Sequence, residues 1–178
     1  MTSPPSDAPG DRAAPAALLL RPARDDDVAA LRTLLDSAWR TTYASILDPA
    51  QLDAMAGAVL RPDVLRARLF AANAVALVAE IDGAIVGHLA ARLGANAAHV
   101  DRLYVADAAQ GRGVGAALLG ALQARLGARA ALTLHVAASN GRALAFYLRQ
   151  GFRETERTRE TVAGVGFDVR VLRRAGAP

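Results

Sequence analysis

Residues 103–115 read LYVADAAQGRGVG: an apolar run typical of a strand, then three glycines at alternating positions. Glycine allows positive φ angles and lets the backbone approach a ligand closely. Beyond this turn, apolar side chains recur at helical spacing, at Val114, Leu118, Leu119, Leu122 and Leu126. Consecutive N–H groups at a helix start, together with the helix dipole, make a site for a diphosphate. The stretch therefore predicts a strand, an anion-binding turn and a helix.

Other uses of such a turn compete with this one. A P-loop ends in Gly-Lys-Ser/Thr, and the chain contains no Lys. Gly111, Gly113 and Ala116 fit the dinucleotide pattern G-x-G-x-x-A, but the strand that follows ends at 135–137 without the expected carboxylate. Too little chain remains for a second nucleotide-binding half. At this point the turn could also be purely structural and bind no ligand.

Upstream of the turn, the pattern predicts an antiparallel meander. Strands are expected at 75–81, 85–93 and 99–105, joined by turns at Asp82-Gly83 and at 94–96. The segments expected before the meander are a strand at 18–21, a helix that starts at Asp25 to Asp27 and continues to Trp39, and weaker helical stretches at 49–55 and 62–70.

Downstream, a short strand at 131–137 is expected to run parallel to 99–105, because a strand, a helix and a strand form a right-handed crossover. A helix over 140–150 follows, with Asn140 as its N-cap and Gly151 as its stop. Strands at 152–162 and 166–172 close the chain. The predicted fold class is mixed α+β (mixed α/β): one domain with a central, mostly antiparallel sheet of about seven strands and about four helices.

Composition limits the function classes. The chain has 178 residues, of which 53% are hydrophobic and 21% charged, so we expect one folded domain at 17–174 and a Pro-rich disordered tail at 1–16. Cysteine is absent, which excludes disulfides and acyl-cysteine chemistry. The net charge of +4 without an Arg block argues against a nucleic-acid partner. We expect no membrane span and no signal peptide, and therefore a cytoplasmic protein.

Two segments together resemble the GNAT superfamily of N-acetyltransferases. Residues 103–115 resemble its strand, pyrophosphate loop and helix, and the signature Gln/Arg-x-x-Gly-x-Gly/Ala is met by Gln110, Gly113 and Gly115. Residues 140–152, NGRALAFYLRQGF, resemble its second block of Asn, Ala, Tyr and Gly-Phe. The resemblance covers about 18–172. It implies acetyl transfer from acetyl-CoA to an unidentified primary amine, a small amine or a protein N-terminus.

The resemblance also implies a donor site between two parallel strands that splay apart. Backbone groups of the strand would hold pantetheine, the loop amides would hold the pyrophosphate, and no metal is implied. The implied donor-binding residues are Leu103, Tyr104, Val105, Gln110, Gly111, Arg112, Gly113, Val114, Gly115, Asn140, Ala143 and Tyr147. The resemblance allows a homodimer, formed through a sheet edge or the last strands.

Amine attack on a thioester passes through a tetrahedral intermediate and needs three kinds of help. By the resemblance, an N–H near Val105 would stabilise the oxyanion, and Tyr147 would protonate the leaving thiolate. A base must keep the amine neutral, since an alkyl amine has a pKa of about 10.4. We expect His99 first and Asp101 second, because both lie on one face of their strand; solvent stays open as an alternative. Further candidates are His88, Glu80 and His135.

The family builds its acceptor side from the first helices and the last hairpin. Trp39, Tyr43 and the loop at 163–166 are therefore expected near the acceptor. Core packing is the competing explanation for Trp39. The hairpin carboxylates that could attract a cationic amine, or form a solvated face, are Glu154, Glu156 and Glu160. A non-catalytic acetyl-CoA-binding sensor stays open beside the enzyme, although it would not need Tyr147.

Overall fold

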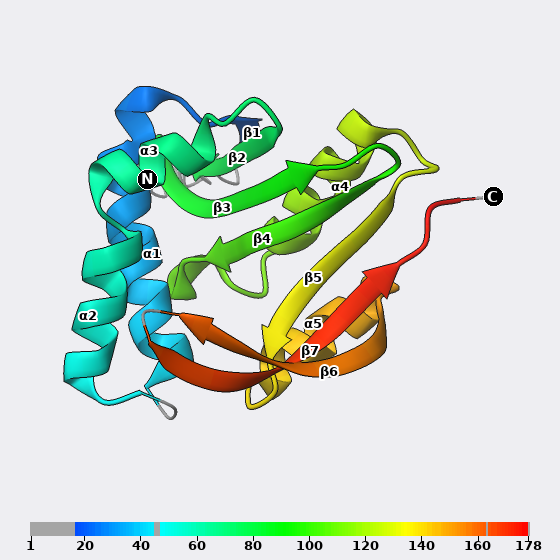
Figure 1. Ribbon diagram of the computed structural model, residues 1–178. Helices are drawn as coiled ribbons and strands as arrows, with labels where there is room; N and C mark the ends of the chain where they lie inside the picture. Colours follow the sequence, from blue (N-terminus) through cyan, green and yellow to red (C-terminus); the bar gives the residue numbers. More distant parts are fainter. Residues whose placement is uncertain (1–16, 45–46, 163, 178) are drawn as a thin grey trace, which may run out of the picture.

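A twisted sheet runs through the whole molecule (Figure 1), and the computed structural model describes residues 17–44, 47–162 and 164–177 of the chain. The strands, in the order β1-β2-β3-β4-β5-β7-β6, are β1 (Leu18–Pro22), β2 (Ala74–Ile81), β3 (Ala84–Leu93), β4 (Ala97–Val105), β5 (Ala131–Ala137), β7 (Val165–Arg174) and β6 (Arg153–Val162). Only β4 and β5 are parallel; the other described neighbours are antiparallel. The predicted mixed class, seven strands and one parallel pair are confirmed. The tail at 1–16 lies outside the described residues.

Among the described residues, five α-helices flank the sheet, one more than the approximate number that the sequence predicts. They are α1 (Val28–Tyr43), α2 (Pro49–Val59), α3 (Pro62–Leu69), α4 (Val114–Leu126) and α5 (Gly141–Arg149), and short 3₁₀ turns lie at Asp25–Asp27 and Asp107–Ala109. Alternate residues of β2 point to opposite faces: Leu77 and Ala79 pack with α4, whereas Val78 packs with α1, α2 and α3. The first three helices thus cover one face, and α4 and α5 cover the other.

Local sequence signals explain where the chain turns and where two helices begin or end. Asp82 and Gly83 both have positive φ angles, 52° and 77°, as a tight hairpin between β2 and β3 requires. Helix α2 begins with a capping box, in which the Asp48 side chain accepts from the Gln51 amide at 2.8 Å. Gly151, with φ of 83°, follows the end of α5. The predicted hairpin and helix stop are therefore confirmed.

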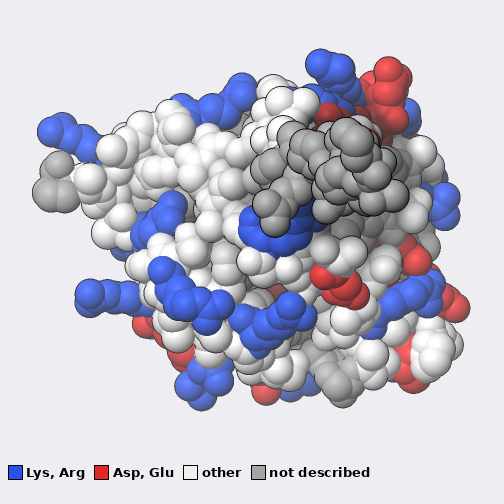
Figure 2. Space-filling model, turned by 180° about the vertical axis from the view of Figure 1, so that it is seen from behind, with Lys and Arg blue, Asp and Glu red and all other residues white. Residues whose placement is uncertain are grey.

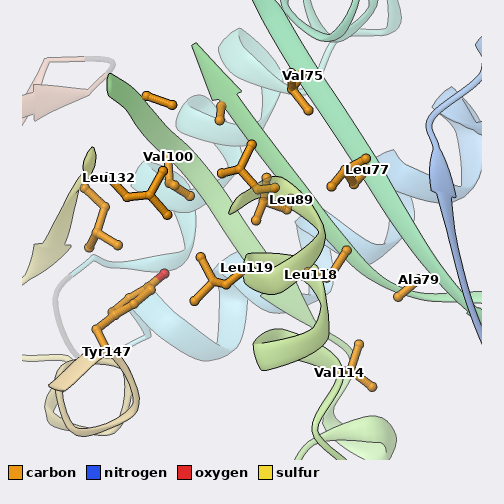
Figure 3. Packing of buried hydrophobic residues seen from close by; sticks show 14 of the residues in the cluster. Val75, Leu77, Ala79, Leu89, Val100, Val114, Leu118, Leu119, Leu132 and Tyr147 are labelled. Atoms are coloured by element: carbon orange, nitrogen blue, oxygen red, sulfur yellow. The ribbon is translucent and has the colours of Figure 1, made fainter. Parts of the chain in front are cut away.

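The face beneath α4 and α5 is a closely packed hydrophobic cluster. Leu118 and Leu119 of α4 are fully buried against Leu89, Val100 and strand residues further along the sheet, as Figure 3 shows. The predicted stripe of α4 is thus buried at Val114, Leu118, Leu119 and Leu122 and partly buried at Leu126. Burial of each such leucine contributes roughly 1.5–3 kcal/mol to folding. This cluster holds the strands on either side of the parallel pair.

Candidate functional site

The parallel strands β4 and β5 separate halfway along their length. They pair from Ala97 with Ala131 to Val100 with Leu134, and no further. Strand β4 nevertheless continues to Val105, and β5 continues to Ala137 while paired with β7. Within the described chain, the edge of β4 at 101–105 that faces β5 therefore has no strand partner, so backbone groups along it are available to a ligand, apart from the Val105 carbonyl, which accepts from the Gln110 side chain.

A β-bulge in β4 lies where the separation starts. Ala90 of β3 is opposite Arg102, and the next residue, Ala91, is opposite Val100, so Asp101 is the extra residue. A bulge bends its strand and re-aims the side chains that follow. Here Leu103 and Val105 pack with the α4 cluster, while Tyr104 packs with the helices of the opposite face.

The Gly-rich turn follows directly on this open edge. Gly111 and Gly113 have φ angles of 77° and 80°, which favour glycine strongly. Gln110 closes the turn from within, because its side-chain amide donates to the Val105 carbonyl at 3.0 Å and to Asp107 Oδ1 at 2.7 Å. Among the described residues, nothing accepts a hydrogen bond from the backbone amides at 111–116. The turn thus presents unpaired donors at the positive end of α4.

The third glycine of the turn has a packing role. A Cβ atom at Gly115 would lie 3.1 Å from Cζ of Phe146 in α5, closer than ordinary van der Waals contact. Glycine at this position lets α4 and α5 approach each other beside the open edge of β4. The sequence alone suggested a ligand contact for all three glycines and did not reveal this helix contact.

The segment that contains the turn, α4 and α5 lacks acidic residues over a long stretch of sequence. From Ala108 to Arg153 the sequence contains no Asp or Glu, and its charged residues are Arg112, Arg125, Arg129, Arg142, Arg149 and Arg153. Figure 2, a view from behind, shows Arg side chains predominating over Asp and Glu on this face. The loop and the starts of α4 and α5 therefore lie in a positive field that suits a polyanion.

Helix α5 contributes the second predicted block. Asn140 caps it as expected, because its Oδ1 accepts from the Ala143 amide at 2.9 Å. Tyr147, one turn after Ala143, is buried between the rings of Phe146 and Phe152. Figure 3 shows the Tyr147 hydroxyl directed toward Val100 and Leu119, beside the point where the parallel strands separate. Burial, and to a lesser extent Tyr43, raise the pKa of Tyr147 well above its usual value, so it stays protonated.

The opposite face of the sheet is hollowed at the same point. A cavity of about 820 Å³ opens beneath α1 and α3, next to the separation of β4 and β5. Its size lies within the usual range for small-ligand sites. Side chains from β4 that line it are His99, Asp101, Arg102 and Tyr104, and its other walls include Trp39, Tyr43, Arg68, Leu69, Arg92, His135, Glu160 and Phe167. Of the predicted catalytic residues, His99 and Asp101 thus lie in one cavity, while Tyr147 belongs to the opposite face.

His99 is half-buried and has a partner on each side. Its Nδ1 lies 3.1 Å from Thr133 Oγ1, and its Nε2 lies 3.9 Å from Asp101 Oδ1. The ring also packs edge-on against His135, with centroids 4.9 Å apart. Burial lowers the pKa of His99 more than the nearby Asp101 raises it, so the imidazole is neutral at pH 7. A neutral imidazole can accept a proton.

The other predicted bases are less available. Both oxygens of Asp101 accept from Arg92, at 2.6 and 2.9 Å. His88 is fully buried in β3, its Nδ1 lies 3.0 Å from the Leu77 carbonyl oxygen, and burial lowers its pKa to about 4. Glu80 pairs with Arg21 outside the cavity. His135 does line the cavity, where its Nδ1 bonds Glu160.

Only some of the residues predicted for the acceptor side line the cavity. Trp39 and Tyr43 line the cavity, and their rings meet edge-on with centroids 6.2 Å apart. Glu160 lines it as well, whereas Glu154 pairs with Arg157 and Arg170 away from it. Glu156 is exposed on β6 and is not among the lining residues. Of the loop at 163–166, Ala163 lies outside the described residues.

Arg102 is one of the cavity residues that the sequence did not reveal. Strict alternation along β4 would place it on the face opposite His99, and only the extra residue at Asp101 brings both side chains into one cavity. The available signal was an Arg between the apolar residues Val100 and Leu103, in a strand that otherwise reads as buried.

Comparisons with known proteins bear on the family and on the fold. The family model described as an acetyltransferase (GNAT) domain matches residues 43–167. A PaiA N-acetyltransferase from Thermoplasma acidophilum, solved with coenzyme A, is 18% identical, with a TM-score of 0.78 over 89% of this chain and 99% of that one. A GCN5-related N-acetyltransferase from Rhodopseudomonas palustris is 26% identical, with a TM-score of 0.73 over 88% and 94%.

A third similar structure is the ribosomal-protein-S18-alanine N-acetyltransferase from Escherichia coli, which is 18% identical. Its TM-score is 0.69, over 91% of this chain and 96% of that one. No curated protein matches the sequence. Within residues 17–44, 47–162 and 164–177, no helix is long and apolar enough to span a membrane, and no cluster of three His, Asp or Glu side chains is placed to hold a metal.

Proposed function

We propose that this chain, which belongs to the GNAT acetyltransferase family, transfers the acetyl group of acetyl-CoA directly to a primary amine. One observation carries the proposal: the unpaired edge of β4 joins a turn of free amides on one face of the sheet and a cavity on the other. A donor held along that edge would meet an acceptor in the cavity at the point where β4 and β5 separate. The reaction would take place in the cytoplasm, where acetyl-CoA is available.

The residues around the open edge fit acetyl-CoA, whose thioester supplies the activated acetyl group. The backbone of Leu103 and Val105 would bind the pantetheine amides as a neighbouring strand would. The amides of the Gly-rich turn would hold the diphosphate, and the arginines of residues 108–153 would attract the remaining phosphate. Asn140, whose Oδ1 already caps α5, would act through its side-chain amide nitrogen.

Three groups would then act on the reacting atoms. With its proton on Nδ1 and donated to Thr133, His99 would keep the lone pair of Nε2 for the incoming ammonium group, directly or through a water. A backbone N–H near Val105 would donate to the developing oxyanion. Tyr147 would donate its proton to the leaving thiolate from the opposite face. We rank Asp101 second as base, because Arg92 engages both of its oxygens.

Binding of acetyl-CoA by calorimetry tests the proposal. The wild type is expected to bind in the micromolar range, and Gly113→Glu is expected to lose binding because a carboxylate would enter the anion site. Gly127→Glu is the matched control, since Gly127 ends the same helix, has a φ of 84° and also has open space around its Cβ position. Release of free thiol on addition of amines then measures transfer.

The three proteins separate the possible results. If Gly127→Glu binds and Gly113→Glu does not, the loss at Gly113 comes from the site and not from backbone strain. If the wild type binds neither acetyl-CoA nor another acyl-CoA, the proposal is wrong. If it binds acetyl-CoA but none of the amines tested causes release of thiol, the protein is a non-catalytic acetyl-CoA sensor and not an enzyme.

A further inference from the structure

Arg102 is a buried charge without a counter-ion. Its side chain projects from β4 into the wall of the cavity, and the residue is only 8% exposed. Within the described part of the chain, it forms no ion pair, and its guanidinium donates no hydrogen bond. A buried guanidinium normally has a carboxylate partner, because removing a charge from water without one costs several kcal/mol in free energy.

The nearby carboxylates are engaged elsewhere. Asp101, the next residue along β4, is held by Arg92, and Glu160 across the cavity is bonded to His135. Burial lowers the pKa of Arg102, and the proximity of Arg68 lowers it further. Arg68 also lines the cavity and belongs to no ion pair in the described chain.

The charged side chains that line the cavity therefore have a net positive charge, and this charge is localised. The charged residues that line it are Arg68, Arg92, Arg102, Asp101 and Glu160, which is three cations against two carboxylates. Once Arg92 is paired with Asp101, the surplus is concentrated at Arg102 and Arg68, at the end of α3. A guanidinium presents a planar fork of donors that matches a carboxylate in a bidentate arrangement.

We propose that the acceptor is a small amine that also carries a carboxylate, with Arg102 as the residue that binds this carboxylate and Arg68 as its support. This inference rests on the proposed acetyl transfer. The amine would face His99 at the separation of β4 and β5, and the carboxylate would point toward α3. A cavity of about 820 Å³ has room for an amino acid with a side chain, packed against Trp39 and Phe167. A polyamine would instead bring cationic charge to an unpaired cation.

Pairs of substrates that differ only in charge test the proposal. Amino acids and their carboxamides are offered with saturating acetyl-CoA, and thiol release gives kcat/KM for each. The amine of a carboxamide is the less basic of the two and is more often neutral, so a preference for the acid cannot come from amine basicity. For the best acceptor, the wild type is expected to prefer the acid at least tenfold.

Two variants locate the preference. Arg102→Met, which keeps the volume of the side chain, is expected to reduce the acid-to-amide ratio to about one, mainly through KM of the acid. Arg66→Met is the control: it removes the same charge from the same helix as Arg68, but its guanidinium pairs with Asp25 outside the cavity, so the ratio is expected to stay unchanged. Acetyl-CoA binding of each variant by calorimetry verifies that it is folded.

The failures of the two proposals are distinguishable. If the wild type binds acetyl-CoA but acetylates no acid faster than its amide, the carboxylate inference is wrong while the acetyltransferase proposal stands. If Arg102→Met binds acetyl-CoA and keeps the preference, the assignment to Arg102 is wrong. The wild-type ratio itself needs no variant, so a misfolded Arg102→Met leaves that part of the test intact. Absence of any acyl-CoA binding overturns the proposed function itself.

Discussion

The two faces of the central sheet differ in how their space is filled. Beneath α4 and α5, leucines and valines pack without a charged residue in the cluster, and Tyr147 directs its hydroxyl toward Val100 and Leu119. Beneath α1 and α3, the sheet carries His88, His99 and Arg102 and leaves a cavity. Both faces meet at Val100, where the parallel pairing ends.

This difference suggests that the two faces have separate roles: the packed face lies beneath α4 and α5, and the hollow face lies beneath α1 and α3. The packed face fixes the position of the open β4 edge and of the tyrosine beside it, because close-packed interiors transmit displacements rather than absorb them. The hollow face keeps charged groups that cost stability, and such groups persist where a ligand uses them. Substitutions on the packed face should therefore alter catalytic rate or stability, whereas those on the hollow face should alter acceptor binding and pH dependence.

Tyr147→Phe should have the largest effect. Loss of the proton donor is expected to lower kcat by about 10²–10⁴-fold, the usual contribution of a general acid, with KM for acetyl-CoA little changed. Because burial raises the pKa of Tyr147, no loss of wild-type rate from its ionisation is expected up to about pH 9.5. Steady-state kinetics from pH 6 to 9.5 measure both.

Tyr43→Phe is the counterpart on the hollow face, where Tyr43 lines the cavity. It removes the same hydroxyl, and it is expected to raise KM for the acceptor without a comparable fall in kcat. If Tyr147→Phe retains full kcat, the tyrosine of the packed face serves packing alone, and the proton must come from solvent.

Two leucines compare the packing of the faces. Leu119→Ala deletes a fully buried side chain from the closed cluster and is expected to cost about 3–4 kcal/mol in free energy of unfolding. Leu69→Ala deletes the same atoms beside the existing cavity. Its cost is expected to be smaller, about 2 kcal/mol, because that side chain already borders the cavity on one side. Urea unfolding measures both, and equal costs would contradict the contrast.

The sequence predicted one face far better than the other. The Gly-rich turn, the stripe of α4 and the Asn140 cap depend on neighbouring residues, so local spacing is enough to find them. The cavity depends on the bulge at Asp101 and on pairs between distant strands, such as His99 with Thr133 and Asp101 with Arg92. Strand register decides these pairs, and the bulge shifts the register in a way that strict alternation along the strand does not show. Arg102 was missed for this reason.

A buried histidine makes the stability of the hollow face depend on pH. Folded His88 stays neutral down to a pKa of about 4 because it is buried, whereas the unfolded chain takes up this proton below about 6.5. Acid therefore favours the unfolded state, and the His88 contribution to stability is lost as the pH falls from 6.5 to 4. The expected loss is roughly 3 kcal/mol.

His88→Asn isolates this contribution. The Asn side-chain amide can keep the hydrogen bond to the Leu77 carbonyl but does not titrate. The difference in unfolding free energy between wild type and variant is expected to change by roughly 3 kcal/mol between pH 7 and pH 4, in favour of the variant at low pH. Urea unfolding at both pH values measures it, and a difference that is independent of pH would show that His88 does not titrate as its burial predicts.

Of the predicted effects, that of His99→Gln should be the smallest, because water in the cavity can partly replace a base. Its loss is expected to lower kcat/KM about 10–100-fold at pH 7, at or below the usual range for a general base. Since burial lowers the pKa of His99, wild-type kcat/KM is expected to fall only below about pH 6.5, where the imidazole becomes protonated. His99→Gln should lack this acidic limb, whereas Asp101→Asn should keep it, because Asp101 is engaged by Arg92. If Asp101→Asn removes the limb and His99→Gln does not, the carboxylate is the base, and the ion pair with Arg92 must open when the acceptor binds.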